Sequence, residues 1–111
     1  NFKPSETMFG LLKKLFSSAP DTDWKELMAG GAVILDVRSK GEFMSGHIAG
    51  AMNIPVDVLG SQLSRLPKGK AIITCCASGM RSSSAKSQLV SAGYTEVYNG
   101  GGWSSLQNKI R

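Results

Sequence analysis

The stretch Ala71-Ile72-Ile73-Thr74-Cys75-Cys76-Ala77-Ser78-Gly79-Met80-Arg81 decides the fold. Its apolar, β-branched first half, Ala71–Cys75, predicts a buried strand that delivers a thiol to its C-terminal end. The following segment, 82–92, predicts a helix, so Cys76 opens a tight strand-to-helix loop. Backbone N–H groups point inward in such a loop, and a helix N-terminus carries partial positive charge. Together with Arg81 these features favour the thiolate, which makes Cys76 a candidate nucleophile for an anionic or sulfur-bearing substrate.

The rest of the chain alternates short apolar runs with segments of helical periodicity. The expected strands are 32–37, 51–54, 71–75 and 95–98, and the expected helices are 24–29, 39–45, 56–66, 82–92 and 103–110. This alternation predicts an α/β fold, an open parallel β-sheet of about five strands with helices on both faces. Because sites in such sheets form beyond the carboxyl ends of the strands, we expect Cys76, Arg38 and a flexible glycine loop, 99–102, to converge on one pocket.

The composition is that of one ordinary globular domain. Of the 111 residues 41% are hydrophobic and 19% charged, which argues against disorder. The net charge is +5, but the basic residues are scattered and lack interleaved aromatics. We therefore expect a mildly basic surface that attracts small anions, and no nucleic-acid partner. No apolar run approaches the roughly 20 residues of a membrane span.

Cysteine usage narrows the chemistry further. Cys75 and Cys76 are adjacent and are the only cysteines, so no disulfide framework exists, and with one histidine they give no metal-ligand spacing. We expect no metal and no cofactor. Adjacent strand residues face opposite sides of a sheet, so Cys75 is expected to pack in the core. The pattern fits a reducing compartment and a cytoplasmic location, with the periplasm as the alternative if a signal or anchor precedes Asn1.

The N-terminal part, 1–20, is expected to be an extension to a domain that covers 21–111. Within it, 1–7 is polar and resembles either a linker from a longer chain or a remnant of an expression tag, and 8–16 has the spacing of a short amphipathic helix. That helix either packs on the domain, which we favour, or contacts a membrane surface or partner, or ends a secretory signal.

Four motifs, in this order along the chain, resemble those of rhodanese-like domains. They are the opening run Leu35-Asp36-Val37-Arg38-Ser39 with Glu42-Phe43, the pair Gly46-His47-Ile48 and Ala51-Met52-Asn53-Ile54-Pro55, the loop Cys76–Ser82, and the glycine turn Asn99-Gly100-Gly101-Gly102. The resemblance covers roughly residues 22–110 and implies a small single-domain sulfurtransferase.

The resemblance also implies roles for individual residues. Cys76 would take the outer sulfur of thiosulfate or of another persulfide donor and pass it to cyanide or a thiol. Arg81 would close the loop and hold the anionic donor. The partners would be a small sulfur-containing anion and a thiol or protein acceptor, with the chain a monomer or weak dimer. The persulfide would be cradled by backbone amides of the loop, those of Ala77, Ser78, Gly79, Met80 and Ser82.

Four further polar residues are expected to make structural or supporting contacts, or to be solvated. Asp36 and Arg38 are expected to form supporting polar contacts near a strand end. His47 lies in a turn and is expected to make a structural hydrogen bond. Glu42 is expected to be either a solvated helix residue or the partner of a nearby arginine.

Alternatives to the sulfurtransferase remain open. A non-catalytic binding module would keep the fold to present a surface, although the intact loop cysteine and arginine favour catalysis. A phosphatase or arsenate reductase ranks third, because related enzymes of that kind have a loop one residue longer than the four residues between Cys76 and Arg81. Many family members carry Arg or Lys where this chain has Ala77, so we expect weak use of thiosulfate.

Overall fold

The computed structural model describes residues 22–111. The expected extension 1–20, with its helix over 8–16, lies outside this range, so the proposed domain boundary stays a prediction. Within residues 22–111, no helix combines the length and the apolar character that crossing a membrane requires.

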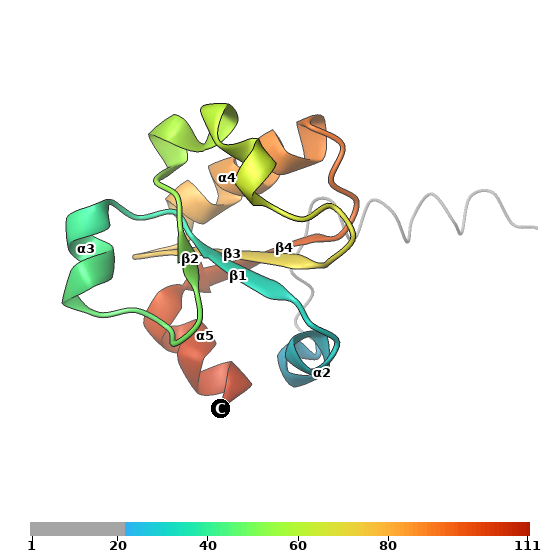
Figure 1. The fold of residues 1–111 in the computed structure, drawn as a ribbon. Coiled ribbons are helices and arrows are strands. Elements are labelled where there is room, and N and C mark those ends of the chain that lie inside the picture. The colour runs from blue at the N-terminus through green and yellow to red at the C-terminus, as the bar shows by residue number, and fades with distance from the viewer. Residues whose placement is uncertain (1–21) are drawn as a thin grey trace, which may run out of the picture.

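Strands and helices alternate along the chain, as the sequence predicts (Figure 1). The elements are α2 (Trp24–Ala29), β1 (Val33–Asp36), α3 (Lys40–Ser45), β2 (Met52–Asn53), the 3-10 helices η1 (Val56–Ser61) and η2 (Leu63–Arg65), β3 (Ile72–Cys76), α4 (Met80–Ser91), β4 (Val97–Gly102) and α5 (Trp103–Ile110).

One open, all-parallel sheet organises these elements, which confirms the predicted fold class. The strand order is β2-β1-β3-β4, and the described part of the chain forms four strands where the sequence predicted about five. The registers pair Asp36 with Cys75 and Cys76 with Gly102. The carboxyl ends of β1, β3 and β4 therefore meet at one edge of the sheet, beside α3 (Figure 1).

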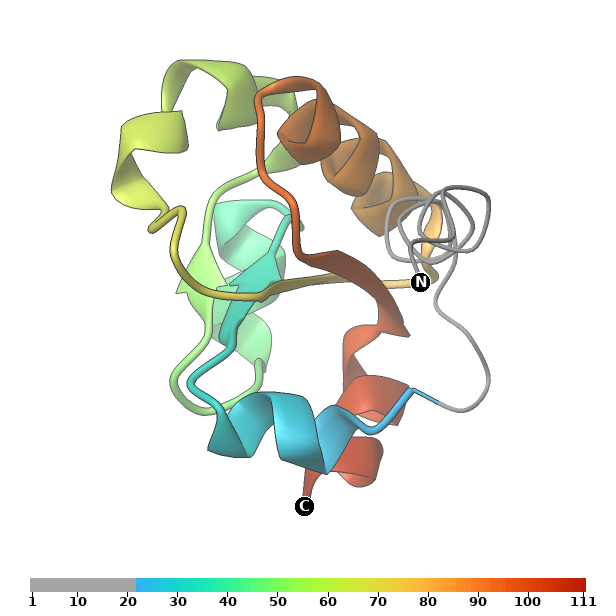
Figure 2. The ribbon, with the colours of Figure 1, turned by 90° about the vertical axis from the view of Figure 1, so that its right-hand side faces the viewer.

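Helices cover both faces of the sheet. α4, η1 and η2 lie over one face, and α2 and α5 lie over the other (Figures 1 and 2). Side chains of β3 alternate between the two cores: Ile72 and Cys76 join the cluster under α4, whereas Ile73 and Cys75 join the cluster under α5. The two adjacent cysteines thus face opposite sides of the sheet, and Cys75 packs in the core as predicted.

The prediction of a flexible loop over 99–102 is wrong, because these residues complete β4. Gly100 shows why glycine is used inside this strand. A Cβ atom there would lie 2.7 Å from Leu106 Cδ2 and 2.9 Å from both Ile73 Cγ2 and the Thr74 carbonyl oxygen. The absence of a side chain lets β4 approach β3 and α5 closely.

Two predicted helices also differ from those observed. α4 begins at Met80, two residues before the predicted start, because Gly79 adopts a left-handed conformation at φ 104° and ends the loop early. The segment predicted as one helix over 56–66 forms η1 and η2 instead. Gly60 lies inside it, and glycine in a helix interior costs about 1 kcal/mol relative to alanine, which disfavours a continuous α-helix.

Candidate active site

The thiol of Cys76 lies at the centre of the loop that joins β3 to α4. Its Sγ accepts hydrogen bonds from the backbone N–H of Gly79 at 2.9 Å and of Ser82 at 3.3 Å. The side chain is fully buried beneath the loop, whereas Ala77, Ser78 and Met80 are exposed around it. The loop is therefore a concave group of amide donors with the sulfur at its base.

The two cysteines differ in acidity. Burial alone would raise the pKa of Cys76, but interactions of the sulfur with Ser82, followed by those with the backbone N–H groups of Gly79 and Ser78, outweigh burial and lower that pKa. Cys75 lacks such an amide cradle, and burial, reinforced by the Asp36 carboxylate, raises its pKa to about 12. Of the two, Cys76 is the better nucleophile at neutral pH.

Side chains of β3 and β4 hold the loop in this shape. Thr74 Oγ1 donates to the Ser82 carbonyl oxygen at 2.9 Å. The Ser82 hydroxyl oxygen lies 2.6 Å from Asn99 Oδ1 and 2.9 Å from the Gly79 carbonyl oxygen. Asn99 Oδ1 also accepts from the N–H of Gly101 at 2.9 Å. These bonds connect the first turn of α4 to β3 and β4 and so hold the amide donors in place around the sulfur.

The end of β4 passes directly behind the loop. A Cβ atom on Gly102 would lie 3.0 Å from the Ala77 carbonyl oxygen, which is tighter than most contacts of this kind. Gly101 has φ 76°, a conformation that side chains disfavour. The glycines at the end of β4 therefore allow the strand to approach the cysteine loop closely.

Arg81 and Glu42 form an ion pair at the mouth of the loop. Arg81 Nη1 lies 2.7 Å from Glu42 Oε1, and Nη2 lies 3.0 Å from Oε2, so one carboxylate engages both terminal nitrogens. Both side chains are 38% exposed. The Arg81 guanidinium, followed by the backbone N–H of Ser39, lowers the pKa of Glu42 to about 2. Of the two predictions for Glu42, the structure supports the arginine partner.

Asp36, the last residue of β1, forms a buried ion pair with Arg38. Arg38 Nε donates to both Asp36 carboxylate oxygens at 3.0 Å, and Nη2 donates to Oδ2 at 2.7 Å. The same guanidinium reaches the Gly46 carbonyl oxygen at 2.7 Å and lies 4.7 Å from the ring centroid of Trp103. These supporting polar contacts attach the α3 segment to β1 and α5.

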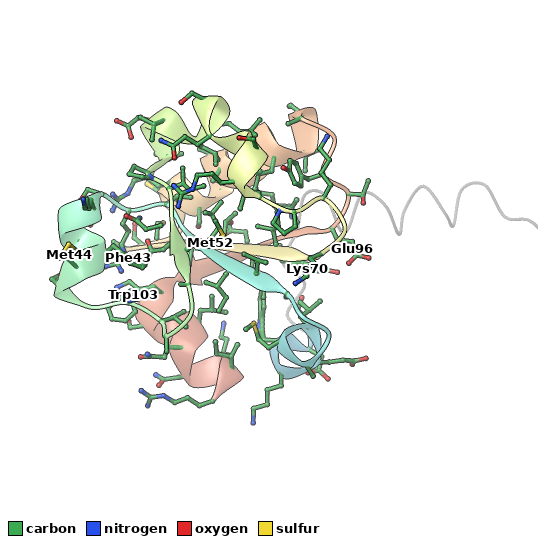
Figure 3. The ribbon with its side chains drawn as sticks, in the orientation of Figure 1. Phe43, Met44, Met52, Lys70, Glu96 and Trp103 are labelled. Atoms are coloured by element: carbon green, nitrogen blue, oxygen red, sulfur yellow. The ribbon has the colours of Figure 1, made fainter. Side chains whose placement is uncertain are left out.

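His47 lies outside the sulfur cradle. Its Nδ1 is 2.7 Å from the Phe43 carbonyl oxygen, its ring stacks on Phe43 at 3.7 Å, and its side chain is exposed. Figure 3 shows Phe43 and Met44 on α3, at the opposite end of the sheet from Lys70 and Glu96. His47 therefore has the structural hydrogen bond that the sequence predicts.

The sequence did not predict the roles of three polar residues that hold the site in shape. Thr74 and Asn99 brace the loop, and Asn53 Nδ2 donates to the carbonyl oxygens of Asp36 and Arg38 at 3.0 Å. Thr74 offered a signal, since it is a hydroxyl in a strand that is otherwise apolar. Among residues 22–111, no group of three or more acidic, histidine or cysteine side chains is placed to hold a metal ion.

Comparison with known proteins decides the family. The sequence model of the rhodanese-like domain matches residues 20–109. The chain belongs to the rhodanese-like domain family. This confirms the resemblance found in the four sequence motifs.

Individual relatives agree with this assignment. The uncharacterised protein YqhL of Bacillus subtilis is 37% identical over 81 residues, which are 72% of this chain and 64% of that protein. The chain thus spans less than two thirds of that relative's length. The thiosulfate sulfurtransferase GlpE of Stutzerimonas stutzeri is 31% identical over 84 residues, 76% of this chain and 77% of that enzyme. A solved structure, described as a rhodanese with anions from E. coli, has a TM-score of 0.63 and 30% identity, covering 67% of this chain and 89% of its own.

Proposed function

We propose that this rhodanese-like protein is a sulfurtransferase that carries sulfane sulfur as a persulfide on Cys76. The observation that carries the proposal is the pair of backbone N–H groups, from Gly79 and Ser82, that donate to the buried Sγ. Such donors stabilise a thiolate before reaction and a persulfide anion after it. The relatives named as sulfurtransferases support the same chemistry.

The proposed reaction has two steps. The Cys76 thiolate attacks the outer sulfur of a donor such as thiosulfate; the new S–S bond forms, the old one breaks, and its electron pair leaves with sulfite. The terminal sulfur of the Cys76 persulfide then carries the negative charge. A nucleophilic acceptor, cyanide or a thiolate, attacks that sulfur and leaves as thiocyanate or a new persulfide, which restores the Cys76 thiolate. Neither step needs an external oxidant or reductant.

The remaining residues have supporting parts in this proposal. Amides of the loop from Ala77 through Met80 surround the outer sulfur, and Ser82 fixes the loop to β4. Arg81 is the cation of this loop that an anionic donor would engage, in competition with Glu42. Asp36 and Arg38 hold the strand ends and α3 in place. The proposed setting is a reducing one such as the cytoplasm, with a small thiol or a protein thiol as acceptor.

Variants of the adjacent cysteines test the proposal. We expect Cys76→Ser to abolish thiocyanate formation from thiosulfate and cyanide, and Cys75→Ser to retain most of it. The two cysteines are matched in burial but face opposite cores, so Cys75→Ser controls for the loss of a buried thiol. Full activity in Cys76→Ser would overturn the proposal. No activity in the wild-type protein with thiosulfate or with a persulfide donor would instead favour a non-catalytic binding module.

A further inference from the structure

Arg81 is the only cationic residue in the loop from Cys76 to Ser82. Both of its terminal nitrogens are engaged by the Glu42 carboxylate at 2.7 and 3.0 Å. A bidentate arginine–carboxylate pair uses the same fork that would otherwise grip an oxyanion. An oxyanion that needs this fork must therefore compete with Glu42.

Glu42 is fixed from its other side as well. The Ser39 N–H and hydroxyl both donate to Glu42 Oε1 at 3.1 Å, and the Ser39 hydroxyl accepts from the Glu42 N–H, which makes a complete capping box at the start of α3. Arg38 binds the Glu42 carbonyl oxygen at 3.3 Å and so attaches this helix to β1. Moving the carboxylate away from Arg81 thus requires breaking the cap of α3.

The charges at the mouth cancel each other. Arg81 is matched by Glu42, and Ala77 adds no cation. Among residues 22–111, the lining of a groove of about 450 Å³ beside Arg81 adds one further cation, Lys40, and one further anion, Asp57. The protein as a whole is basic, with a net charge of +5, so the balance of charge around Arg81 in the described part of the chain is a local feature.

From this geometry, and resting on the proposed function, we propose that Glu42 is a specificity-determining residue for the sulfur donor. By occupying the Arg81 fork it makes the site discriminate against dianionic donors such as thiosulfate and in favour of singly charged organic persulfides. Electrostatic attraction scales with the charge of the ligand, so neutralising the one loop cation costs a dianion more than a monoanion. Glu42 acts through Arg81 and need not touch the sulfur.

Glu42→Gln in the full chain removes the charge and keeps an oxygen that can accept from Ser39. Two donors are compared, thiosulfate and the persulfide of 2-mercaptoethanol, with cyanide as the acceptor. We expect kcat/KM for thiosulfate to rise about ten-fold and that for the persulfide to change by less than about three-fold. Glu26→Gln, an exposed glutamate in the first turn of α2, is the matched control and leaves the ratio of the two donors unchanged.

Glu42→Asp is the conservative variant, since it keeps the charge while shortening the reach. We expect its donor ratio to stay closer to that of the wild-type protein than to that of Glu42→Gln. A donor ratio unaffected by Glu42→Gln, or an equal fall with both donors, would overturn the inference and leave Glu42 a structural cap of α3.

A binding measurement keeps the inference separate from the proposed function. Calorimetric titration of thiosulfate into Cys76→Ser, with and without Glu42→Gln, measures affinity without turnover. We expect the added Glu42→Gln change to tighten binding about ten-fold, and unchanged affinity would contradict the inference. If no donor supports turnover but binding tightens, the proposed function fails, while the control of anion binding by Glu42 stands.

Discussion

Ala77→Arg tests how the loop handles a doubly charged donor. Ala77 directly follows Cys76, its side chain is exposed, and its carbonyl oxygen is packed against Gly102. The main chain at this position is therefore fixed while the side chain projects to solvent, so an arginine is accommodated without disturbing either core. The new guanidinium would be a cation at the mouth that Glu42 does not already occupy.

The expected gain follows from the exposure of the site. A hydrogen bond to a charged group contributes roughly 1.5–3 kcal/mol, and an exposed contact belongs at the lower end of that range. About 1.4 kcal/mol corresponds to a ten-fold change in an equilibrium constant. We therefore expect Ala77→Arg to raise kcat/KM for thiosulfate about ten-fold, mainly through a lower KM.

The assay is steady-state thiocyanate formation from thiosulfate and cyanide. Ala77→Gln is the control, because glutamine extends into the same solvent space without a charge. The gain of Ala77→Arg should shrink in about 1 M salt, where the screening length falls to roughly 3 Å. If Ala77→Arg and Ala77→Gln behave alike, or if the parent is already fast and Ala77→Arg changes nothing, the account of the missing cation is wrong.

Two further predictions concern packing and acidity. Gly100→Ala should destabilise the fold by about 1–3 kcal/mol and lower Tm by several degrees, because the added methyl group overpacks against Leu106 and Ile73. Gly60→Ala is the control and should leave Tm unchanged, since a Cβ atom there meets open space. Equal melting temperatures of the two variants would refute the packing argument. The rate of alkylation of Cys76 in the native protein should rise with pH to a midpoint below the ordinary cysteine pKa, because the pKa of this thiol is lowered. Cys75, with a pKa of about 12, should stay unlabelled at neutral pH. Peptide mapping by mass spectrometry across a pH series measures both rates, and equal labelling of the two cysteines would contradict the assignment.

Local patterns predicted most of the fold. The β-branched run before Cys76 and the alternation of strands and helices specified a parallel sheet, because strand burial and crossover connections depend on sequence patterns over short distances. The extent of β4 could not be predicted in the same way. Glycines at 100–102 normally indicate a loop, and only the closeness of Leu106 and Ile73 explains their use in a strand.

In the candidate site, too, local features could be predicted from the sequence and long-range contacts could not. The loop with its amide donors follows from one continuous stretch of sequence, so Cys76 and its cradle could be predicted. The pairing of Arg81 with Glu42 joins residues 39 positions apart, and the Ser82–Asn99 contact joins residues 17 positions apart. Such pairs depend on how α3, α4 and β4 meet at one edge of the sheet, which no local spacing specifies.

The most direct test of the central claim is mass spectrometry of the intact, non-reduced protein after incubation with a sulfur donor. The account predicts one added sulfur atom, mapped to the peptide containing Cys75 and Cys76, present in Cys75→Ser, absent in Cys76→Ser and removed by cyanide. Thiosulfate and the persulfide of 2-mercaptoethanol are used in parallel, so that a weak response to the dianion is not mistaken for inactivity. An added sulfur that persists in Cys76→Ser, or none with either donor in the wild-type protein, would contradict the account.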